Sequence, residues 1–303
     1  MDLPQNFIDT VINTWGDKGQ RWLKELPTLI SYCQEKWQLT NLKLHENLSY
    51  NCILFANRSN DTSVILKLCH PSSDFLKEIH ALNAYNGQGA VKLFDCDIDK
   101  GALLMEALIP GKSLKSFFPE LDEKAELIAI EVIKKLHSCG LPKNIADFPT
   151  LEQWLSSLDE ANEILFASLI QRAKELAAYL LNTQSKPILL HGDLHHDNIL
   201  LNNNEWVSID PKGVIGEAAY EAGAFIRNPM PELLKQPDPL TIINNRVNLF
   251  SAHLNIERQR LIDWSFVQAV LAACWAFEDK NDWVSWIKCA QIMENLLTQD
   301  KII

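Results

Sequence analysis

The stretch from residue 187 to residue 213 limits the possible folds of this chain more than any other part of it. Three short apolar runs follow one another there, each of strand length: residues 188–190, 199–201 and 206–209. Asp193 follows the first run, three consecutive asparagines (202–204) follow the second, and Asp210 follows the third. This order predicts a buried strand, a polar loop and a tight β-hairpin that ends in a carboxylate.

The spacing of three polar residues in this stretch suits phosphoryl transfer. Such a reaction needs a group that orients the attacking hydroxyl and a divalent metal that neutralises the phosphate oxygens, and Mg²⁺ prefers hard oxygen ligands. Protein kinases place an Asp, then an Asn in the same loop, then a second Asp after the next hairpin, and Asp193, Asn198 and Asp210 have that order. We therefore assign Asp193 as the base or hydroxyl-orienting group, and Asn198 and Asp210 as Mg²⁺ ligands.

An ordinary polar loop beside a hairpin is the alternative, because Asp and Asn are common turn formers. For any one of the three residues that alternative is the better explanation. The three residues together, each next to a short apolar run, favour the phosphoryl-transfer site.

The same stretch resembles a known family. Residues 191–198, His-Gly-Asp-Leu-His-His-Asp-Asn, and residues 209–213, Ile-Asp-Pro-Lys-Gly, are similar to the aminoglycoside phosphotransferase superfamily. The greater likeness is to its branch of streptomycin 6-kinases and hydroxyurea phosphotransferases. Residues 216–221 and 15–27 also resemble that branch, with Glu217-Ala218 where the branch usually has Asp-Pro.

The resemblance implies both a fold and an activity. The fold is expected to be α+β, protein-kinase-like and two-lobed, with a helical extension and a nucleotide-binding sheet in residues 1–107 and a mainly helical lobe with the catalytic loop and acceptor site in residues 108–303. The activity is expected to be transfer of the γ-phosphate of ATP to a hydroxyl of an aminoglycoside-like acceptor such as streptomycin. Hydroxyurea or another small hydroxylated metabolite stays open, because this fold serves many acceptors.

Periodicity in the first third of the chain fits this fold. Apolar residues recur at helical spacing through residues 4–38, and alternating runs in residues 42–69 predict a small antiparallel sheet. Further strands are predicted at 91–95 and 102–105. The sheet is predicted to end at Pro110-Gly111.

Lys67 is the candidate phosphate ligand of this region. It lies on the apolar run Val64-Ile65-Leu66, and a lysine on a buried strand is costly unless it is paired. Glu78 lies on the following amphipathic helix, so we assign Lys67 to the α/β-phosphates and Glu78 as its ion-pair partner. A solubilising lysine on an edge strand is the alternative.

Other nucleotide contacts follow only from the resemblance. It implies that the loop of residues 46–51, which contains Ser49 and no glycine, lies over the phosphates, although a plain hairpin turn fits that loop equally well. It also implies a hinge at Glu106 and Leu108 whose backbone groups bind the adenine.

The acceptor contacts are the least constrained. Related enzymes use acids from their C-terminal helices to bind guanidinium or amine groups, so the resemblance implies candidates at Glu217, Glu221, Glu278 and Asp279. An acidic helix end with exposed carboxylates explains Glu278 and Asp279 equally well.

Composition excludes several classes of protein. The net charge of −11 offers no basic surface for nucleic acid. Seven scattered cysteines indicate reduced thiols in a cytoplasmic protein. No uninterrupted apolar run approaches the ~20 residues of a membrane span, and no secretion signal is recognisable at the N-terminus. We therefore expect no nucleic-acid or membrane partner.

Two other functions compete with the kinase interpretation. The histidines at 191, 195 and 196 raise the possibility of a zinc hydrolase, but His195 and His196 are adjacent and point in different directions, and no His-Glu-x-x-His helix is present. In the kinase interpretation His191 holds the loop instead. A kinase-like module that binds nucleotide without turnover is favoured by the glycine-free loop and by Glu217-Ala218. It is disfavoured by the complete set Lys67, Glu78, Asp193, Asn198 and Asp210, since such a module has no need of the base.

Overall fold

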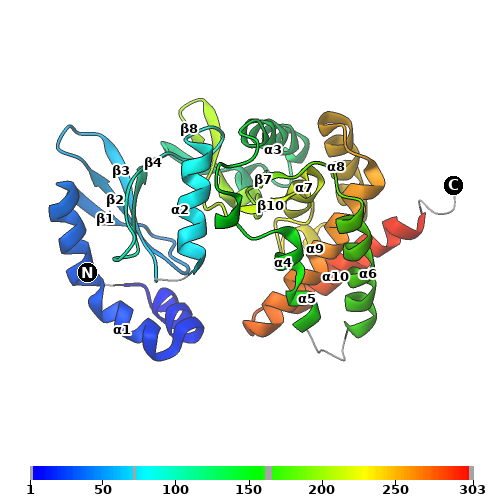
Figure 1. Ribbon diagram of the computed structural model, residues 1–303, viewed down its shortest axis with the longest axis horizontal. Helices are drawn as coiled ribbons and strands as arrows, with labels where there is room; N and C mark the ends of the chain where they lie inside the picture. Colours follow the sequence, from blue (N-terminus) through cyan, green and yellow to red (C-terminus); the bar gives the residue numbers. More distant parts are fainter. Residues whose placement is uncertain (1–2, 71–72, 161–165, 300–303) are drawn as a thin grey trace. The chain divides into compact units, whose positions relative to one another are not determined.

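The computed structural model describes residues 3–70, 73–160 and 166–299. The chain divides into two compact units, which are described separately below. Unit 1 comprises residues 1–87 and 91–109, and unit 2 comprises residues 88–90 and 110–303. Figure 1 colours both units along the chain.

Unit 1 is a five-stranded sheet with one helix on each face (Figure 1). Its elements are α1 (Gln5–Trp37), β1 (Thr40–Leu44), β2 (Cys52–Asn57), β3 (Ser63–Leu68), α2 (Ser73–Tyr85), β4 (Leu93–Asp97) and β5 (Ala102–Glu106). The strand order is β1-β2-β3-β5-β4, and all neighbours are antiparallel. The predicted small antiparallel sheet is confirmed.

Helix α1 is bent at Gly16, where φ is +56° and ψ is −132°. Only glycine adopts such a backbone conformation without a steric penalty. The two arms then approach closely at Gly19, where an added Cβ would lie 2.5 Å from the carbonyl oxygen of Val11. The predicted helical segment at residues 4–38 is therefore present as two packed arms.

Alternation along β3 assigns its side chains to the two faces of the sheet, since successive residues of a strand point to opposite sides. Val64, Leu66 and Leu68 are fully buried in the core that the sheet shares with α1. Lys67 has the opposite parity and faces α2. The face that carries Lys67 is thus separated from α1 by the sheet itself.

Unit 2 is mainly helical. Its helices are α3 (Asp122–His137), α4 (Leu151–Leu155), α5 (Ser157–Glu160), α6 (Ala167–Asn182), α7 (Ala218–Ile226), α8 (Pro239–Leu254), α9 (Arg258–Glu278) and α10 (Trp283–Gln299). Its strands are β6 (Pro110–Ser113), β7 (Ile188–Leu190), β8 (Ile199–Asn202), β9 (Glu205–Ser208) and β10 (Val214–Gly216). They form a three-stranded sheet, β6-β8-β9, and the pair β10-β7.

Strand β6 begins at Pro110-Gly111, where the sheet of unit 1 has already ended as predicted, and it belongs to a second sheet. It pairs with β8 at Pro110–Asn202 and Ser113–Leu200, with an irregularity between them. Proline fits here because β6 is an edge strand, where a missing N–H breaks no ladder. Proline and glycine at the start of a strand leave no alternating pattern in the sequence, which is why the strand was not predicted.

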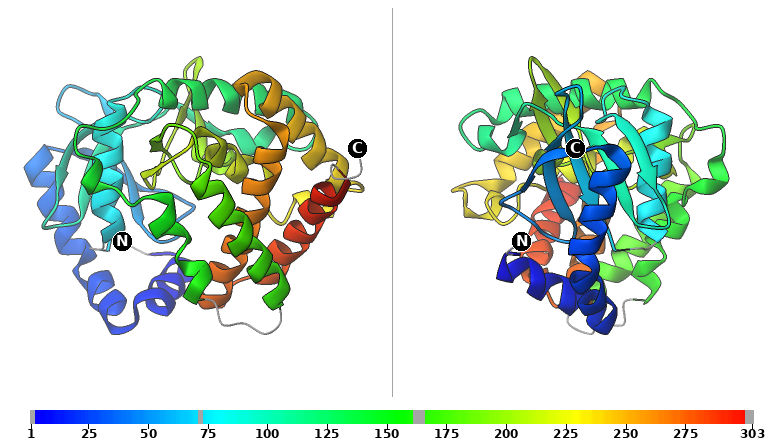
Figure 2. Two further views of the ribbon diagram at one scale, coloured as in Figure 1. Left: turned by 45° about the vertical axis from the view of Figure 1, so that its right-hand side comes forward. Right: turned by 90° about the vertical axis from the view of Figure 1, so that its left-hand side faces the viewer.

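Helix α9 is the core helix of unit 2. It packs against α6, α7, α8 and α10, and Figure 2 shows it in orange beside α6 in green and α10 in red. Among the described helices, it alone has the length and apolar composition of a membrane span, but 78% of its apolar window is buried inside the protein. Its composition is accounted for by this core position.

A buried charged cluster joins α3 to α8 and to the end of α7. Arg246 is fully buried and donates to Asp122 at 2.9 and 2.7 Å. It also donates to the carbonyls of Phe225, Ile226 and Asn228, which end α7. A buried guanidinium with this many acceptors is paired and hydrogen-bonded, as its burial requires.

Two further titratable groups lie in this cluster. His196 is stacked on Phe225 at 3.8 Å, and burial lowers its pKa to about 3. Glu126 is 3% exposed, and burial together with the charge of Asp122 raises its pKa to about 8. Both groups are therefore neutral in the folded protein near pH 7.

Glu126 makes stability depend on pH in a defined window. An unfolded glutamate has a pKa of 4.5, so between pH 4.5 and 8 the folded state holds a proton that the unfolded state has lost. Its stabilising contribution is complete below pH 4.5 and is lost as pH rises through 8, with a slope of up to about 1.4 kcal/mol per pH unit. His196 has the opposite sign and acts only below pH 6.5.

We therefore expect Glu126→Gln to flatten the decline in the free energy of unfolding between pH 6.5 and 8, measured by urea denaturation. Glu131 is exposed on the same helix and paired with Lys134, so Glu131→Gln should keep the wild-type slope. Equal slopes for wild type and Glu126→Gln would show that Glu126 is ionised in the folded protein.

Candidate active site

The loop that carries Asp193 begins at the end of β7. Leu189 and Leu190 are buried and pair with β10, as predicted for the first apolar run. Gly192 has φ +84°, and a Cβ there would lie 3.1 Å from Val214. The loop therefore leaves the sheet by a turn that favours glycine, and Asp193 follows directly.

His191 connects this loop to the segment that carries Asp210. Its ring Nδ1 accepts the backbone N–H of Asp193 at 3.3 Å, so the ring proton lies on Nε2, which donates to the carbonyl of Ile209 at 2.9 Å. Its own carbonyl accepts from Lys212 at 2.8 Å. The prediction that His191 holds the loop is confirmed.

This arrangement requires a neutral imidazole. A protonated ring has donors on both nitrogens and could not accept from the N–H of Asp193. His191 is fully buried, and that burial lowers its pKa below the ordinary value of 6.5 despite the opposing charges of Glu221 and Asp193. Burial and hydrogen bonding thus favour the same protonation state.

Glu221 binds the backbone at the start of this loop. Its carboxylate accepts the backbone N–H of His191 at 2.7 Å and that of Gly192 at 3.0 Å. Burial acts to raise the pKa of Glu221, but His137 and His191 stabilise the anion, and the pKa lies below its ordinary value. Glu221 is an ionised, fully enclosed acceptor for two N–H groups.

Asn198 is oriented by its amide nitrogen. Nδ2 donates to the carbonyl of Asp193 at 2.9 Å and lies 3.3 Å from Nε2 of His195. Within the described part of the chain Oδ1 has no protein partner, and it is the atom that a hard cation would bind. Asp193 itself is about one third exposed, with its Oδ2 3.8 Å from the ring of His195.

Asp210 follows β9 in a left-handed backbone conformation, with φ +62°. Among residues other than glycine, Asp and Asn tolerate this region best. The side chain of Lys212 donates to its Oδ2 at 2.8 Å. The left-handed residue turns the chain immediately after the predicted hairpin.

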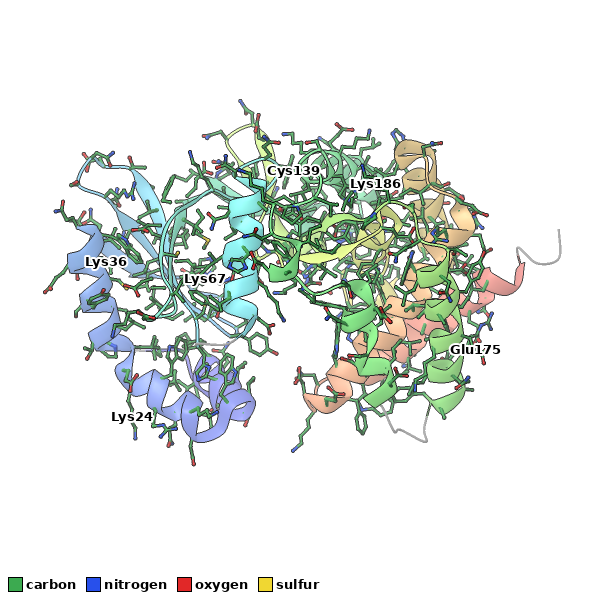
Figure 3. The ribbon with its side chains drawn as sticks, viewed as in Figure 1. Lys24, Lys36, Lys67, Cys139, Glu175 and Lys186 are labelled. Atoms are coloured by element: carbon green, nitrogen blue, oxygen red, sulfur yellow. The ribbon has the colours of Figure 1, made fainter. Side chains whose placement is uncertain are left out.

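Lys67 and Glu78 form an ion pair in unit 1. Figure 3 shows Lys67 between the sheet and α2. The amino group lies 2.6 and 2.8 Å from the two carboxylate oxygens. Their side chains are only 6% and 10% exposed. The predicted ion pair is confirmed, and its burial excludes the alternative of a solubilising edge lysine.

The remaining nucleotide candidates lie in unit 1. Ser49 is exposed in the loop between β1 and β2, and the neighbouring Leu48 is buried in the core beneath it. Glu106 ends β5 and its N–H donates to the carbonyl of Lys92 at 2.9 Å, while Leu108 is buried. The anchor at Leu48 restrains this loop although it has no glycine, a feature that sequence analysis missed.

The acceptor candidates fall into two groups. Glu278 and Asp279 are exposed at the end of α9. Glu217 and Glu221 are 1% exposed, and Glu217 accepts from Arg260 and Trp264 of α9. The carboxylates of this second pair are enclosed by protein donors, which favours a positioning role for them over contact with an acceptor.

Two observations bear on whether unit 2 could bind a metal ion. The free Oδ1 of Asn198 and the carboxylate of Asp210 are hard oxygen donors, the type that Mg²⁺ binds. Over residues 3–70, 73–160 and 166–299, no three His, Cys, Asp or Glu side chains are grouped as metal ligands. Both ring nitrogens of His191 are hydrogen-bonded to the main chain, and the fully buried ring of His196 is stacked on Phe225, so the structure gives the zinc alternative no support.

The folds of solved proteins agree with this architecture and define its class. A choline/ethanolamine kinase family protein from Mesorhizobium loti superimposes with a TM-score of 0.65 at 13% identity, covering 88% of this chain and 95% of that one. An aminoglycoside phosphotransferase, solved as a ternary complex with ADP and hygromycin B, gives a TM-score of 0.60 at 9% identity and covers 87% of this chain and 97% of its own. The chain thus has a protein-kinase-like fold.

Sequence comparison identifies the family. Residues 37–280 match the model of the aminoglycoside/hydroxyurea antibiotic resistance kinase family, and the chain belongs to that family. It is 24% identical to the streptomycin 6-kinase of Streptomyces glaucescens over 92% of both chains. It is also 24% identical to the hydroxyurea phosphotransferase of Kitasatospora aureofaciens, over 92% of this chain and 81% of that protein. The chain is therefore an ATP-dependent phosphotransferase.

Glu221→Ala should lower the free energy of unfolding by about 2–5 kcal/mol, because two buried N–H groups lose their acceptor. Urea denaturation measures this loss. Glu152→Ala, an exposed glutamate at the start of α4, should change stability by no more than about 0.5 kcal/mol. Equal effects of the two substitutions would contradict the role assigned to Glu221.

Proposed function

We propose that this protein transfers the γ-phosphate of ATP to a hydroxyl group of a streptomycin-type aminoglycoside. The observation that supports streptomycin as the acceptor is the match to a streptomycin 6-kinase over 92% of both chains. The loop geometry of unit 2 supports the reaction type. The ring of His191 bonds the main chain of Asp193 and of Ile209, next to Asp210, and the amide of Asn198 bonds the carbonyl of Asp193.

Asp193 acts on the acceptor. Its carboxylate is partly exposed, so it can accept a hydrogen bond from the attacking hydroxyl and take its proton as the bond to phosphorus forms. The main chain on either side of it is fixed by the ring of His191 and the amide of Asn198. Fixing the base in this way provides orientation before the acceptor arrives.

Asn198 and Asp210 would hold Mg²⁺. The ion would supply positive charge for the β- and γ-phosphate oxygens. The left-handed backbone at Asp210 and the oriented amide of Asn198 set the two donors before any ion binds. Lys212, which contacts Asp210, would keep that carboxylate in place until then.

Unit 1 would bind the nucleotide. Lys67, held by Glu78, would contact the α- and β-phosphates, and Ser49 would lie over them. The backbone of Glu106 and Leu108 would bind the adenine. Residues 1–107 then serve as the nucleotide lobe, and residues 108–303 as the lobe of the catalytic loop and the acceptor.

Acids at the end of α9 would bind the acceptor. Glu278 and Asp279 are exposed, as a site for a cationic guanidinium or amine requires. We locate the reaction in the cytoplasm, in keeping with seven cysteines that form no disulfide among the described residues. Hydroxyurea is a second candidate acceptor, because a hydroxyurea phosphotransferase matches 92% of this chain.

Release of ADP from Mg²⁺-ATP tests the reaction and separates the acceptors. We expect release with streptomycin to exceed release with hydroxyurea, other aminoglycosides or no acceptor. Asp193→Asn should lower kcat by about 10²–10⁴-fold, the usual contribution of a general base, and leave ATP affinity within a few-fold. Asp197→Asn is the matched control, since Asp197 is an exposed acid of the same loop.

The outcomes are distinct. Full turnover by Asp193→Asn would overturn the role of Asp193. ATP binding without release for any acceptor would favour a binding module. Release with hydroxyurea alone would replace the proposed acceptor with the second candidate.

Asp210→Asn tests the metal ligand. Asn tolerates the left-handed backbone at this position, so the change removes charge with little strain. We expect Mg²⁺-dependent ATP affinity, measured by calorimetry with and without Mg²⁺, to fall about tenfold or more, a loss of at least ~1.4 kcal/mol. Unchanged affinity in the presence of Mg²⁺ would contradict the assignment of Asp210.

A further inference from the structure

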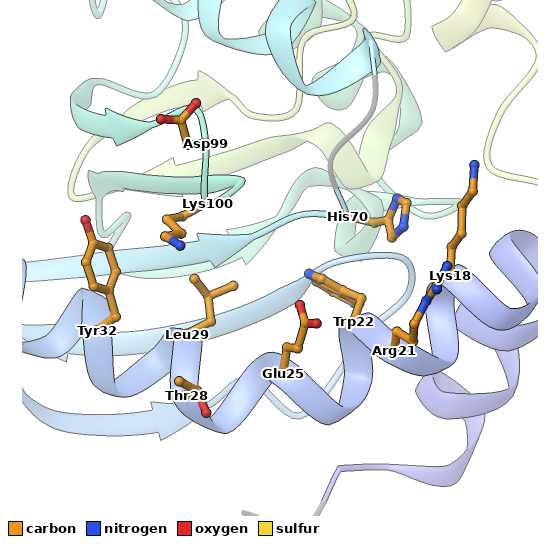
Figure 4. Close-up of a pocket in the computed structure, with 10 residues that line it drawn as sticks. All are labelled: Lys18, Arg21, Trp22, Glu25, Thr28, Leu29, Tyr32, His70, Asp99 and Lys100. Carbon is orange, nitrogen blue, oxygen red and sulfur yellow. The ribbon is translucent and has the colours of Figure 1, made fainter.

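Unit 1 contains a cavity of about 830 Å³ on the α1 side of its sheet. Figure 4 shows its lining, which comes from α1, from His70 just beyond β3 and from the turn between β4 and β5. Lys67 faces the other side of the sheet toward α2, so this cavity is separate from the predicted phosphate lysine. Its volume is in the range of small-molecule sites.

One wall of the cavity carries a buried donor without an acceptor. Trp22 is 5% exposed, and its indole Nε1 has no hydrogen-bond partner among the described residues. Edge contacts with Phe7 and His70, each at 6.2 Å between ring centroids, fix the indole. Figure 4 shows its nitrogen end directed toward the middle of the lining residues.

An unpaired buried N–H is rare in native proteins and costs about 1–3 kcal/mol. The fixed ring of Trp22 cannot turn to another acceptor. A ligand oxygen in the cavity would satisfy it. The wall of the cavity therefore favours a ligand that accepts a hydrogen bond at this point.

The charges around the cavity indicate the sign of the ligand. Lys18 and Arg21 lie at one end and Lys100 lies toward the other (Figure 4). In the part of the chain that the structure describes, Lys18 and Arg21 form no ion pair. Glu25 and Asp99 are the acids of the lining, so cations exceed acids by three to two in a chain whose net charge is −11.

Part of the remaining lining is apolar or aromatic, beside Thr28 and His70. Leu29 and the rings of Trp22 and Tyr32 border the same space. Tyr32 is itself held in place, because its hydroxyl donates to Asp97 at 2.9 Å. Such walls suit a planar ring, and the surrounding polar groups fix its orientation.

We propose that this cavity binds a small aromatic anion, with its ring against the apolar wall and one anionic oxygen accepting the N–H of Trp22. Arg21 and Lys18 neutralise the anion at that end. The ligand class is a planar aromatic carboxylate or phosphate monoester. Neither the proposed phosphotransfer nor any residue assigned to it is needed for this binding.

Calorimetric titration with 2-naphthoate, 2-naphthyl phosphate and the neutral 2-naphthalenemethanol tests the proposal. We expect one molecule of an anionic probe to bind per chain, at least about tenfold more tightly than the alcohol. The two anions distinguish a carboxylate site from a phosphate site. Excess Mg²⁺-ATP should not displace the bound probe.

Variants of the lining test the named residues. Trp22→Phe keeps a ring and removes the N–H, and Arg21→Gln removes one charge. Each should weaken anion binding about tenfold or more, as for loss of one hydrogen bond to a charged group. Glu25→Gln should strengthen binding. Lys24→Gln is the matched control, because Lys24 is exposed on the same helix outside the lining (Figure 3).

Several results would overturn the proposal. They are absence of binding at millimolar probe, equal binding of the alcohol, displacement by ATP, or equal losses in Lys24→Gln and Arg21→Gln. Thermal unfolding checks that Trp22→Phe is folded. Arg21 is exposed, so Arg21→Gln gives a decisive result even if Trp22→Phe does not fold.

Discussion

The candidate site depends on the two hydrogen bonds that the neutral ring of His191 forms. One nitrogen accepts from the main chain of Asp193 and the other donates to the main chain of Ile209, next to Asp210. One imidazole therefore positions the main chain at both the proposed base, Asp193, and a proposed metal ligand, Asp210. Burial keeps that imidazole neutral. The geometry of the partly exposed site therefore depends on a group in the buried interior of unit 2.

Two buried charged side chains, Glu221 and Arg246, stabilise this arrangement. Glu221 binds the two N–H groups that precede Asp193, and Arg246 binds the carbonyls that end α7, the helix of Glu221. Such groups are costly to bury unless each is fully paired. Their pairing makes α7 a rigid support, and rigid supports are what catalytic groups require for orientation.

Local patterns were enough to predict most of the strands and the hairpin between Asn198 and Asp210, because turn chemistry and strand periodicity depend on neighbouring residues. The roles of Asp193, Asn198 and Asp210 stay predictions. The pairing of Lys67 with Glu78 was predicted because burial demands a partner. The direction of Glu221 was not, because an acid within an apolar helix does not reveal which N–H groups it will meet. Strand β6 was missed because its pairing with β8 is set by residues about ninety positions away.

The state of the His191 ring tests this account most directly. Nitrogen NMR of histidine-labelled protein, assigned with His191→Gln, reports which ring nitrogen carries a proton. We expect a proton on Nε2 alone at pH 6, where an ordinary histidine with pKa 6.5 is mostly protonated. A ring at position 191 that is protonated on both nitrogens at pH 6, or on Nδ1 alone, would contradict it.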